Sequence, residues 1–130
     1  ILQATREQVP RSKEPMFLLA REITPFEWYG LAISDHTATL ALSSSVATID
    51  VPPGVRHPRA WSDRSDKYYV VMEGRVHFDV GGEGSALGPA DVCIVRRGER
   101  FEYANRTPSM ARLALVHTPP FDSDAEHLEE

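Results

Sequence analysis

Hydrophobic and polar residues alternate one by one along several short stretches of this chain. In RVHFDV, at positions 75–80, valine and phenylalanine alternate with arginine, histidine and aspartate. A period of two is the signature of a β-strand that buries one face. This stretch is therefore predicted to be a strand.

Other short apolar stretches recur at intervals of roughly ten residues, with glycine, proline or serine between them. They are MFLLA at 16–20, PFEWYGLAIS at 25–34, TATLALSSSVATIDV at 37–51, KYYVVM at 67–72, VCIVR at 92–96, FEYAN at 101–105 and ARLALVH at 111–117. The stretch at 37–51 predicts one long strand, or two strands joined at its three serines. None has the three-to-four residue spacing of a long helix. The pattern predicts an all-β domain, a sandwich or barrel of antiparallel strands.

The length of 130 residues fits a single domain. We expect a polar N-terminal arm at 1–15, a barrel at 16–121 and an acidic tail at 122–130. The chain begins at Ile1, and whether residues before it were removed is left open.

Charge and composition narrow the functional classes. The net charge is −5, and the basic residues are dispersed, so no nucleic-acid-binding face is expected. No apolar run approaches the eighteen or more residues that a membrane span needs, and the N-terminus lacks the apolar core of a signal peptide. The single cysteine, Cys93, lies in the apolar run DVCIV, which predicts a buried thiol and no disulfide framework. A cytoplasmic location fits these features.

The spacing of turn residues resembles that of the cupin family, small double-stranded β-helix barrels, from Thr37 to Phe121. The first motif of that family is a glycine, five residues, His-any-His, three or four residues, Glu, six residues and a glycine. Gly54 and Gly74 fall on its two glycines. Gly98 and Asn105 fall on the later glycine and the asparagine of the second motif. The resemblance implies a cupin-like barrel of jelly-roll type.

The resemblance also implies where a metal would be held, by three histidines and a glutamate. These positions carry Ala60, Ser62, Lys67 and Phe101. Alanine and phenylalanine have no ligand atom, and an ammonium repels a divalent cation. No metal or other cofactor is therefore expected as aligned. Substitute sites built from His57, Asp63 and Asp66, or from His77 and His117, stay open.

Side chains two apart on a strand share a face, so Lys67 lies with Tyr69, and Phe101 lies with Tyr103 and Asn105. If the resemblance holds, both faces line the barrel cavity. Lys67 would then bind an anion, stabilise an enolate, act as a base or form a Schiff base. The plainer alternative is an ion pair with Asp63 or Asp66.

Further candidates surround this lysine. Tyr69 and Tyr103 would donate hydrogen bonds or act as acids, or only fill the cavity. His57, after the Pro-Pro-Gly turn, would transfer protons near the barrel mouth, or lie solvated on the surface. We place Lys67, Tyr69, Tyr103 and His57 as candidate catalytic residues. The candidate ligand contacts are Trp61, Asp63, Arg97, Phe101 and Asn105.

Three functions remain open. The first is a metal-independent enzyme that carries out acid–base chemistry, such as isomerisation, epimerisation, cyclisation or elimination, on a small oxygenated or cyclic metabolite. The second is a ligand-binding or sensor module without catalysis, and the third is a metal-dependent oxygenase or isomerase with displaced ligands. The expected partners are a small molecule in the cavity and a second copy of the chain. A homodimer is expected because cupin barrels often dimerise through an exposed sheet edge, and the MFLLA segment could cover such an edge.

Overall fold

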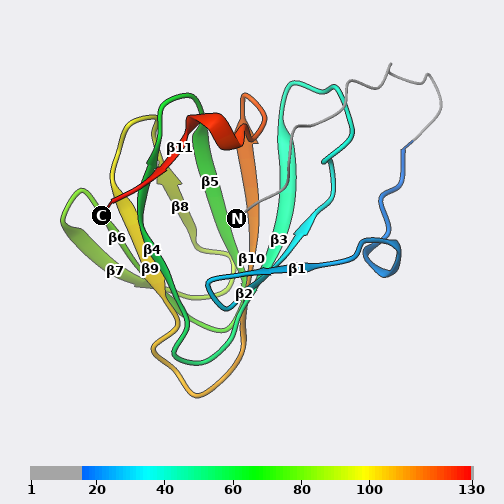
Figure 1. Cartoon of the computed structure of the whole chain (residues 1–130). Helices are drawn as coiled ribbons and strands as arrows, with labels where there is room; N and C mark the ends of the chain where they lie inside the picture. Colours follow the sequence, from blue (N-terminus) through cyan, green and yellow to red (C-terminus); the bar gives the residue numbers. More distant parts are fainter. Residues whose placement is uncertain (1–15, 130) are drawn as a thin grey trace.

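The computed structural model describes residues 16–129, and these residues form two antiparallel sheets that face each other (Figure 1). One sheet has the strand order β1-β2-β3-β10-β5-β8, and the other has the order β11-β4-β9-β6-β7. The strands are β1 Phe26–Trp28, β2 Leu31–Asp35, β3 Ser45–Val51, β4 Arg56–Ser62, β5 Asp66–Glu73, β6 Val76–Val80, β7 Glu83–Leu87, β8 Val92–Val95, β9 Phe101–Ala104, β10 Ala111–Thr118 and β11 Glu126–Leu128. Two 3-10 turns, η1 Ala20–Glu22 and η2 Ser123–Ala125, complete the regular structure. The predicted all-β barrel is confirmed.

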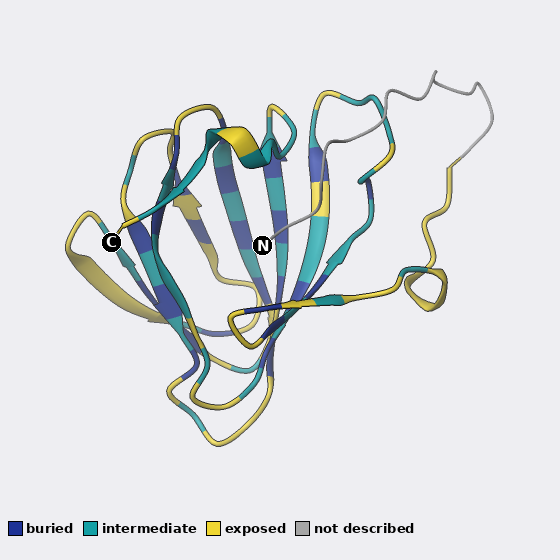
Figure 2. Cartoon of the chain, in the orientation of Figure 1, coloured by how far each residue is buried: buried dark blue, intermediate teal, exposed yellow. Residues whose placement is uncertain are grey.

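Strand alternation separates a buried interior from a more accessible exterior. In β5, Lys67, Tyr69 and Val71 are buried while their neighbours are not, and β9 buries Phe101 and Tyr103 in the same way. The resulting bands are visible along the strands in Figure 2. The faces predicted from the sequence are therefore the faces that point inward.

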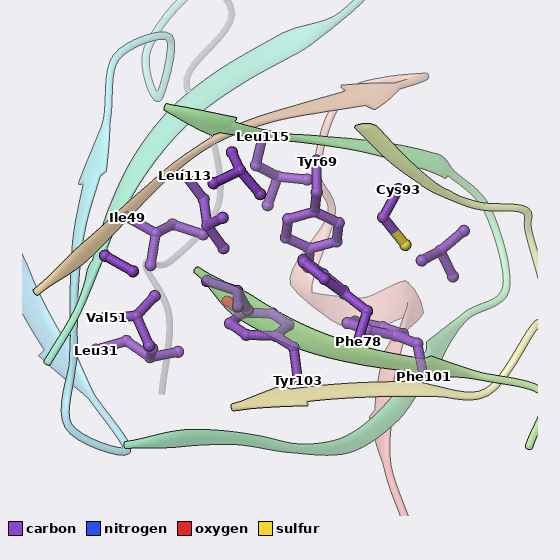
Figure 3. Close-up of a cluster of buried hydrophobic side chains, with 14 of the residues drawn as sticks. Leu31, Ile49, Val51, Tyr69, Phe78, Cys93, Phe101, Tyr103, Leu113 and Leu115 are labelled. Carbon is purple, nitrogen blue, oxygen red and sulfur yellow. The ribbon is translucent and has the colours of Figure 1, made fainter. Parts of the chain in front are cut away.

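Aliphatic side chains and a group of aromatic rings fill the interior between the sheets (Figure 3). Tyr69 lies 5.3 Å from Phe78 and 5.3 Å from Tyr103, measured between ring centroids. Phe101 packs 5.9 Å from Tyr69. Offset and edge-on aromatic pairs add stabilisation beyond the area they bury. Tyr69 and Phe101 thus form part of a buried aromatic cluster that keeps water away from neighbouring polar groups.

The glycines of the first motif occupy turns that other residues would strain. Gly54 has a φ of 79° and Gly74 a φ of 77°, both in the left-handed region. A Cβ added at Gly74 would lie 2.7 Å from the carbonyl oxygen of Met110. This second constraint makes Gly74 the less replaceable of the two.

Some segments differ from the sequence-based expectations. Residues 16–19, expected to begin a strand, have no regular structure, and their four hydrophobic side chains are exposed. The stretch at 37–51 contains only β3, because its first part turns. The EGSAL segment forms the exposed edge strand β7, which has no apolar alternation to reveal it. The residues expected to form a tail contribute η2 and β11, and β11 pairs with β4.

The polar arm expected at 1–15 lies outside the described residues. Within residues 16–129, no helix is long and apolar enough to cross a membrane. The exposed residues 16–19 belong to no strand of either sheet, and the homodimer stays a prediction.

Candidate functional site

A cavity of about 90 Å³ opens between the two sheets. Its walls are mainly apolar and aromatic, and a few polar groups converge on it. The lining comprises Phe26, Trp28, Ile33, Asp35, Ser45, Val46, Ala47, Ile49, His57, Ala60, Lys67, Tyr69, Tyr103, Leu115, His117, Phe121, Glu126, His127 and Leu128. An apolar cavity with few converging polar groups is the usual form of a small-molecule site. The four candidate catalytic residues, His57, Lys67, Tyr69 and Tyr103, all line it.

Lys67 is the cationic centre of the cavity. Its Nζ donates to Oε1 of Glu126 at 2.6 Å and lies 2.8 Å from Nε2 of His117. His117 is its direct cross-strand neighbour on β10, whereas Glu126 reaches it from β11 on the opposite sheet. Burial lowers the pKa of Lys67, and the charge and hydrogen bond of Glu126 oppose this shift. The carboxylate of Glu126 thus offsets the desolvation cost of burying the Lys67 ammonium.

The predicted alternative of an ion pair with Asp63 or Asp66 is corrected. Asp63 is exposed and pairs with His127 at 2.6 Å, while Asp66 accepts from the backbone N–H of Arg97. Lys67 is ion-paired, but its partner is Glu126. The expectation of a paired lysine was right and the partner was wrong.

His57 lies on strand β4 rather than on a loop, and its ring faces the cavity. Its Nδ1 lies 2.6 Å from the carbonyl oxygen of Pro58. A carbonyl only accepts, so we assign the proton of the neutral ring to Nδ1, which leaves Nε2 as a lone-pair acceptor. Within residues 16–129, no hydrogen bond engages Nε2.

The surroundings of His57 keep it neutral. Desolvation lowers its pKa from 6.5 to about 3; the hydrogen bond to Pro58 opposes the shift and the charge of Lys67 adds to it. The residue is half-buried and lines the cavity. Trp28 and Tyr103 pack 5.0 Å and 4.9 Å from it. His57 is thus a neutral ring whose Nε2 is free to accept a hydrogen bond.

Tyr69 and Tyr103 are buried phenols, and burial is the largest cause that raises the pKa of each. Both stay neutral under ordinary conditions and act as hydrogen-bond donors more readily than as acids. The hydroxyl of Tyr103 is buried without a hydrogen-bond partner in the described part of the chain. An unsatisfied buried hydroxyl costs about 1–3 kcal/mol, so this group is available to donate to a water or a ligand.

The metal-ligand positions of the cupin motifs carry Ala60, Ser62, Lys67 and Phe101. Ala60 pairs with Phe101 across β4 and β9, and neither offers a donor. Ser62 uses its hydroxyl to accept from the backbone N–H groups of Arg64 and Ser65. Lys67 brings an ammonium to the glutamate position. These residues do not fit a divalent metal.

The substitute ligand sets are not assembled either. His77 lies on β6 in one sheet and His117 on β10 in the other. Asp63 pairs with His127, and Asp66 accepts from the backbone N–H of Arg97. Residues 16–129 contain no group of three or more His, Cys, Asp or Glu side chains placed to share a metal.

Five predicted ligand contacts lie elsewhere than in the cavity lining. Trp61 is sandwiched outside it, with the Arg100 guanidinium 3.8 Å above its ring and His127 stacked at 5.2 Å. Asp63 and Arg97 are exposed. We therefore remove these three from the site, because their side chains point outward.

The other two predicted contacts have structural roles. Phe101 is buried beneath the site, where its ring lies 5.5 Å from Nζ of Lys67. Asn105 donates to the carbonyl oxygens of Val51 and Ser109, at 2.8 Å and 2.7 Å, and so fixes a turn. Its amide has no capacity left for a ligand in the cavity.

Sequence reasoning named His117 only in an alternative metal site, and it missed Glu126 altogether. His117 had a usable signal, because Ala111, Leu113 and Leu115 alternate inward and the same period places His117 inward. Glu126 had none. It follows a 3-10 turn on a three-residue strand, and no periodicity precedes it.

The fold and the motif spacing define a cupin. The family model described as “Cupin domain” matches residues 47–117, and the chain belongs to the cupin family. No curated protein matches the sequence.

Several solved structures share this fold. Streptomyces PAC13, a nucleoside dehydratase whose structures include complexes with uridine, is 20% identical with a TM-score of 0.78, covering 90% of this chain and 92% of PAC13. KdgF from Halomonas sp. is 14% identical with a TM-score of 0.75, covering 85% and 99%. A predicted oxalate decarboxylase from Thermotoga maritima is 18% identical with a TM-score of 0.72, covering 80% and 99%. At these identities the likeness concerns the fold alone.

Proposed function

We propose that this cupin is a metal-independent acid–base enzyme that eliminates water from a small hydroxylated ring metabolite. One observation carries the proposal: the open Nε2 of neutral His57 faces the same cavity as the ion-paired Lys67. A neutral base and a cationic acid within one apolar enclosure are the two groups that an elimination requires. The fold shared with a nucleoside dehydratase supports the same reaction class.

The step is written for a substrate with a hydroxyl β to a carbonyl. Nε2 of His57 removes the proton from the carbon next to the carbonyl, and that electron pair forms the carbon–carbon double bond. The carbon–oxygen bond breaks, and the departing hydroxide takes a proton from Lys67 to leave as water. Solvent later takes the proton from His57 and returns one to Lys67.

The buried phenol of Tyr103 has a separate role in this step. As a neutral donor, it hydrogen-bonds the carbonyl oxygen while negative charge develops there. Donors fixed in place before the reaction stabilise such charge strongly in a site with little water. The lowered pKa of Lys67 favours proton transfer to the leaving group.

A second candidate function, binding without turnover, is favoured by the ion pair itself. Glu126 and His117 both engage Lys67, as expected for a lysine that only fills a cavity. Turnover decides between the two functions.

The test uses chelator-treated protein whose metal content has been measured by elemental analysis. It is incubated with a panel of β-hydroxy aldehydes and ketones derived from nucleosides and simple sugars. Turnover is followed by the absorbance of the conjugated product and by the loss of one water in mass spectra. We expect His57→Gln to lower the rate by about 10²–10⁴-fold, and His77→Gln, outside the cavity, to leave it unchanged.

Two results would contradict the proposal. One is that no member of the panel loses water although some bind, which leaves the binding function. The other is that activity appears only after iron, nickel or zinc is added. The predicted homodimer is tested separately by sedimentation at micromolar concentration, where a monomer would contradict it.

A further inference from the structure

Two buried polar atoms in the cavity walls have no hydrogen-bond partner among residues 16–129. They are Oε2 of Glu126 and the hydroxyl of Tyr103. Oε1 of Glu126 already accepts from Lys67, so Oε2 is the free half of a carboxylate that is otherwise anchored. Tyr103 is only 2% exposed. Buried polar atoms are nearly always paired in folded proteins, so two orphans lining one cavity indicate a ligand that pairs with them.

Glu126 and Tyr103 line the same cavity, from strands β11 and β9 of one sheet. Tyr69 lines it from β5 of the facing sheet, 5.3 Å from Tyr103 by ring centroids. After burial, the charges of Tyr103 and Glu126 are further causes that raise the pKa of Tyr69. One small molecule can therefore contact Glu126 and Tyr103 together.

The charged residues that line the cavity determine whether a charged ligand can bind there. Lys67 is the only lysine or arginine among the lining residues of the described chain, and Glu126 already compensates it. His57 also lines the cavity, and it is held neutral. A carboxylate or phosphate placed here would find no uncompensated cation and would lie close to Glu126. Burying such a charge without a partner is costly.

We propose that the cavity selects an uncharged, polyhydroxylated ring, with one ligand hydroxyl donating to Oε2 of Glu126 and one ligand oxygen accepting from the hydroxyl of Tyr103. Phe26, Trp28, Ile33 and Leu128 offer the apolar wall against which one face of the ring lies. This inference rests on the proposed function and extends it to the substrate class. It replaces the sequence-based expectation that Lys67 binds an anion.

The same arrangement places the leaving group. A hydroxyl that donates to Oε2 of Glu126 lies beside Nζ of Lys67, because both oxygens belong to one carboxylate. Glu126 is then a positioning residue: it orients the hydroxyl that Lys67 protonates. The C-terminal strand β11 thereby becomes part of the site.

The test is binding, measured by calorimetry, and it needs no turnover. Two matched pairs vary only the charge: uridine with uridine 5′-carboxylate, and methyl β-D-glucopyranoside with methyl β-D-glucuronide. The first pair represents nucleosides and the second simple sugars. Uridine is also compared with 2′-deoxyuridine and 3′-deoxyuridine. We expect an uncharged member to bind at least about tenfold more tightly than its carboxylate, and one deoxy analogue to lose about tenfold or more, as for a lost hydrogen bond to a charged group.

Glu126→Gln supplies the decisive variant. It removes the negative charge and leaves Lys67 uncompensated, so the preference for the uncharged member should vanish or reverse. Glu129→Gln is the matched control, because Glu129 is half-exposed and pairs with Arg59 outside the cavity. It should bind as the wild type does.

The inference is overturned if a carboxylate binds as tightly as its uncharged partner, if neither deoxy analogue is weakened, or if no probe binds at millimolar concentration. Selective binding of uncharged probes without any turnover would overturn the proposed reaction and leave the inference standing. Water loss from a substrate that binds without hydroxyl or charge selectivity would support the proposed reaction and overturn the inference.

Discussion

The ammonium of Lys67 and the carboxylate of Glu126 meet at 2.6 Å, although 59 positions separate them in the sequence. Lys67 stands where the cupin motif places a metal-binding glutamate, and Glu126 comes from the last strand of the described chain. Their side chains are 5% and 15% exposed. The pair joins the two sheets, and both of its side chains line the cavity.

Breaking this pair on one side should be more harmful than removing it altogether. Lys67→Met leaves a largely buried carboxylate unpaired, and we expect it to lower the free energy of unfolding by about 3–5 kcal/mol. The double variant with Glu126→Gln should recover much of that loss. Urea unfolding of the two single variants and the double variant measures the coupling.

An exposed ion pair provides the control for this cycle. Arg112 and Asp50 lie 2.8 Å apart with side chains 47% and 36% exposed. Arg112→Gln and Asp50→Asn should show a coupling below about 1 kcal/mol. Equal coupling in the two cycles would contradict the buried character of the Lys67–Glu126 pair.

The stability of the protein should fall in mild acid because of His57. Its native pKa of about 3 lies below the 6.5 of a free imidazole, so the unfolded chain binds the proton first as the pH drops. The stabilisation is complete above pH 6.5 and is lost progressively toward pH 3, by up to about 1.4 kcal/mol per pH unit. Urea unfolding between pH 7.5 and 4.5 measures this slope. His57→Gln should have a shallower slope, and an unchanged slope would show that His57 is not buried in neutral form.

Tyr103→Phe should separate stability from function. The substitution removes a buried hydroxyl without a partner, so the free protein should be unchanged or more stable by about 1 kcal/mol. Thermal unfolding measures this, with the exposed Tyr29→Phe as control. The Tyr103→Phe variant should bind uridine or methyl β-D-glucopyranoside about tenfold more weakly than the wild type. A marked loss of stability would instead indicate that the hydroxyl serves the fold.

Asn105→Ala should destabilise the barrel and leave the cavity chemistry unchanged in the folded protein. Asn105 satisfies the carbonyl oxygens of Val51 and Ser109 and accepts from the N–H of Thr107 at 2.9 Å. Leaving these groups unpaired should cost about 2–4 kcal/mol in urea unfolding. Ser43→Ala, at an exposed position, should have almost no effect. Loss of ligand binding without loss of stability would restore Asn105 to the site.

Much of the fold could be predicted from the sequence, because the alternation of apolar and polar residues in a strand is a local signal. The period of two placed Lys67, Tyr69 and Tyr103 on inward faces, and the motif glycines located the turns around them. The same period extended along β10 would have added His117. The edge strand β7 was not predicted, because an exposed strand needs no apolar face.

The site was only partly predictable because its partners are set by tertiary packing. Nothing local links Lys67 to Glu126, which arrives after a turn and a three-residue strand. The neutral state of His57 depends on enclosure by Trp28 and Tyr103, from other strands. Charged residues near the motif, such as Asp63 and Arg97, were natural candidates in sequence, yet their side chains face solvent.

The protonation state of His57 is the most direct test of this account, and it can be measured without a known substrate. Two-dimensional ¹H–¹⁵N spectra of the histidine rings, recorded from pH 8 to pH 4.5 and assigned with His57→Gln, report both tautomer and charge. We predict that His57 carries its proton on Nδ1, leaves Nε2 free and does not titrate in this range. A ring that titrates near pH 6.5, or that carries its proton on Nε2, would contradict the proposal that His57 is the base of the cavity.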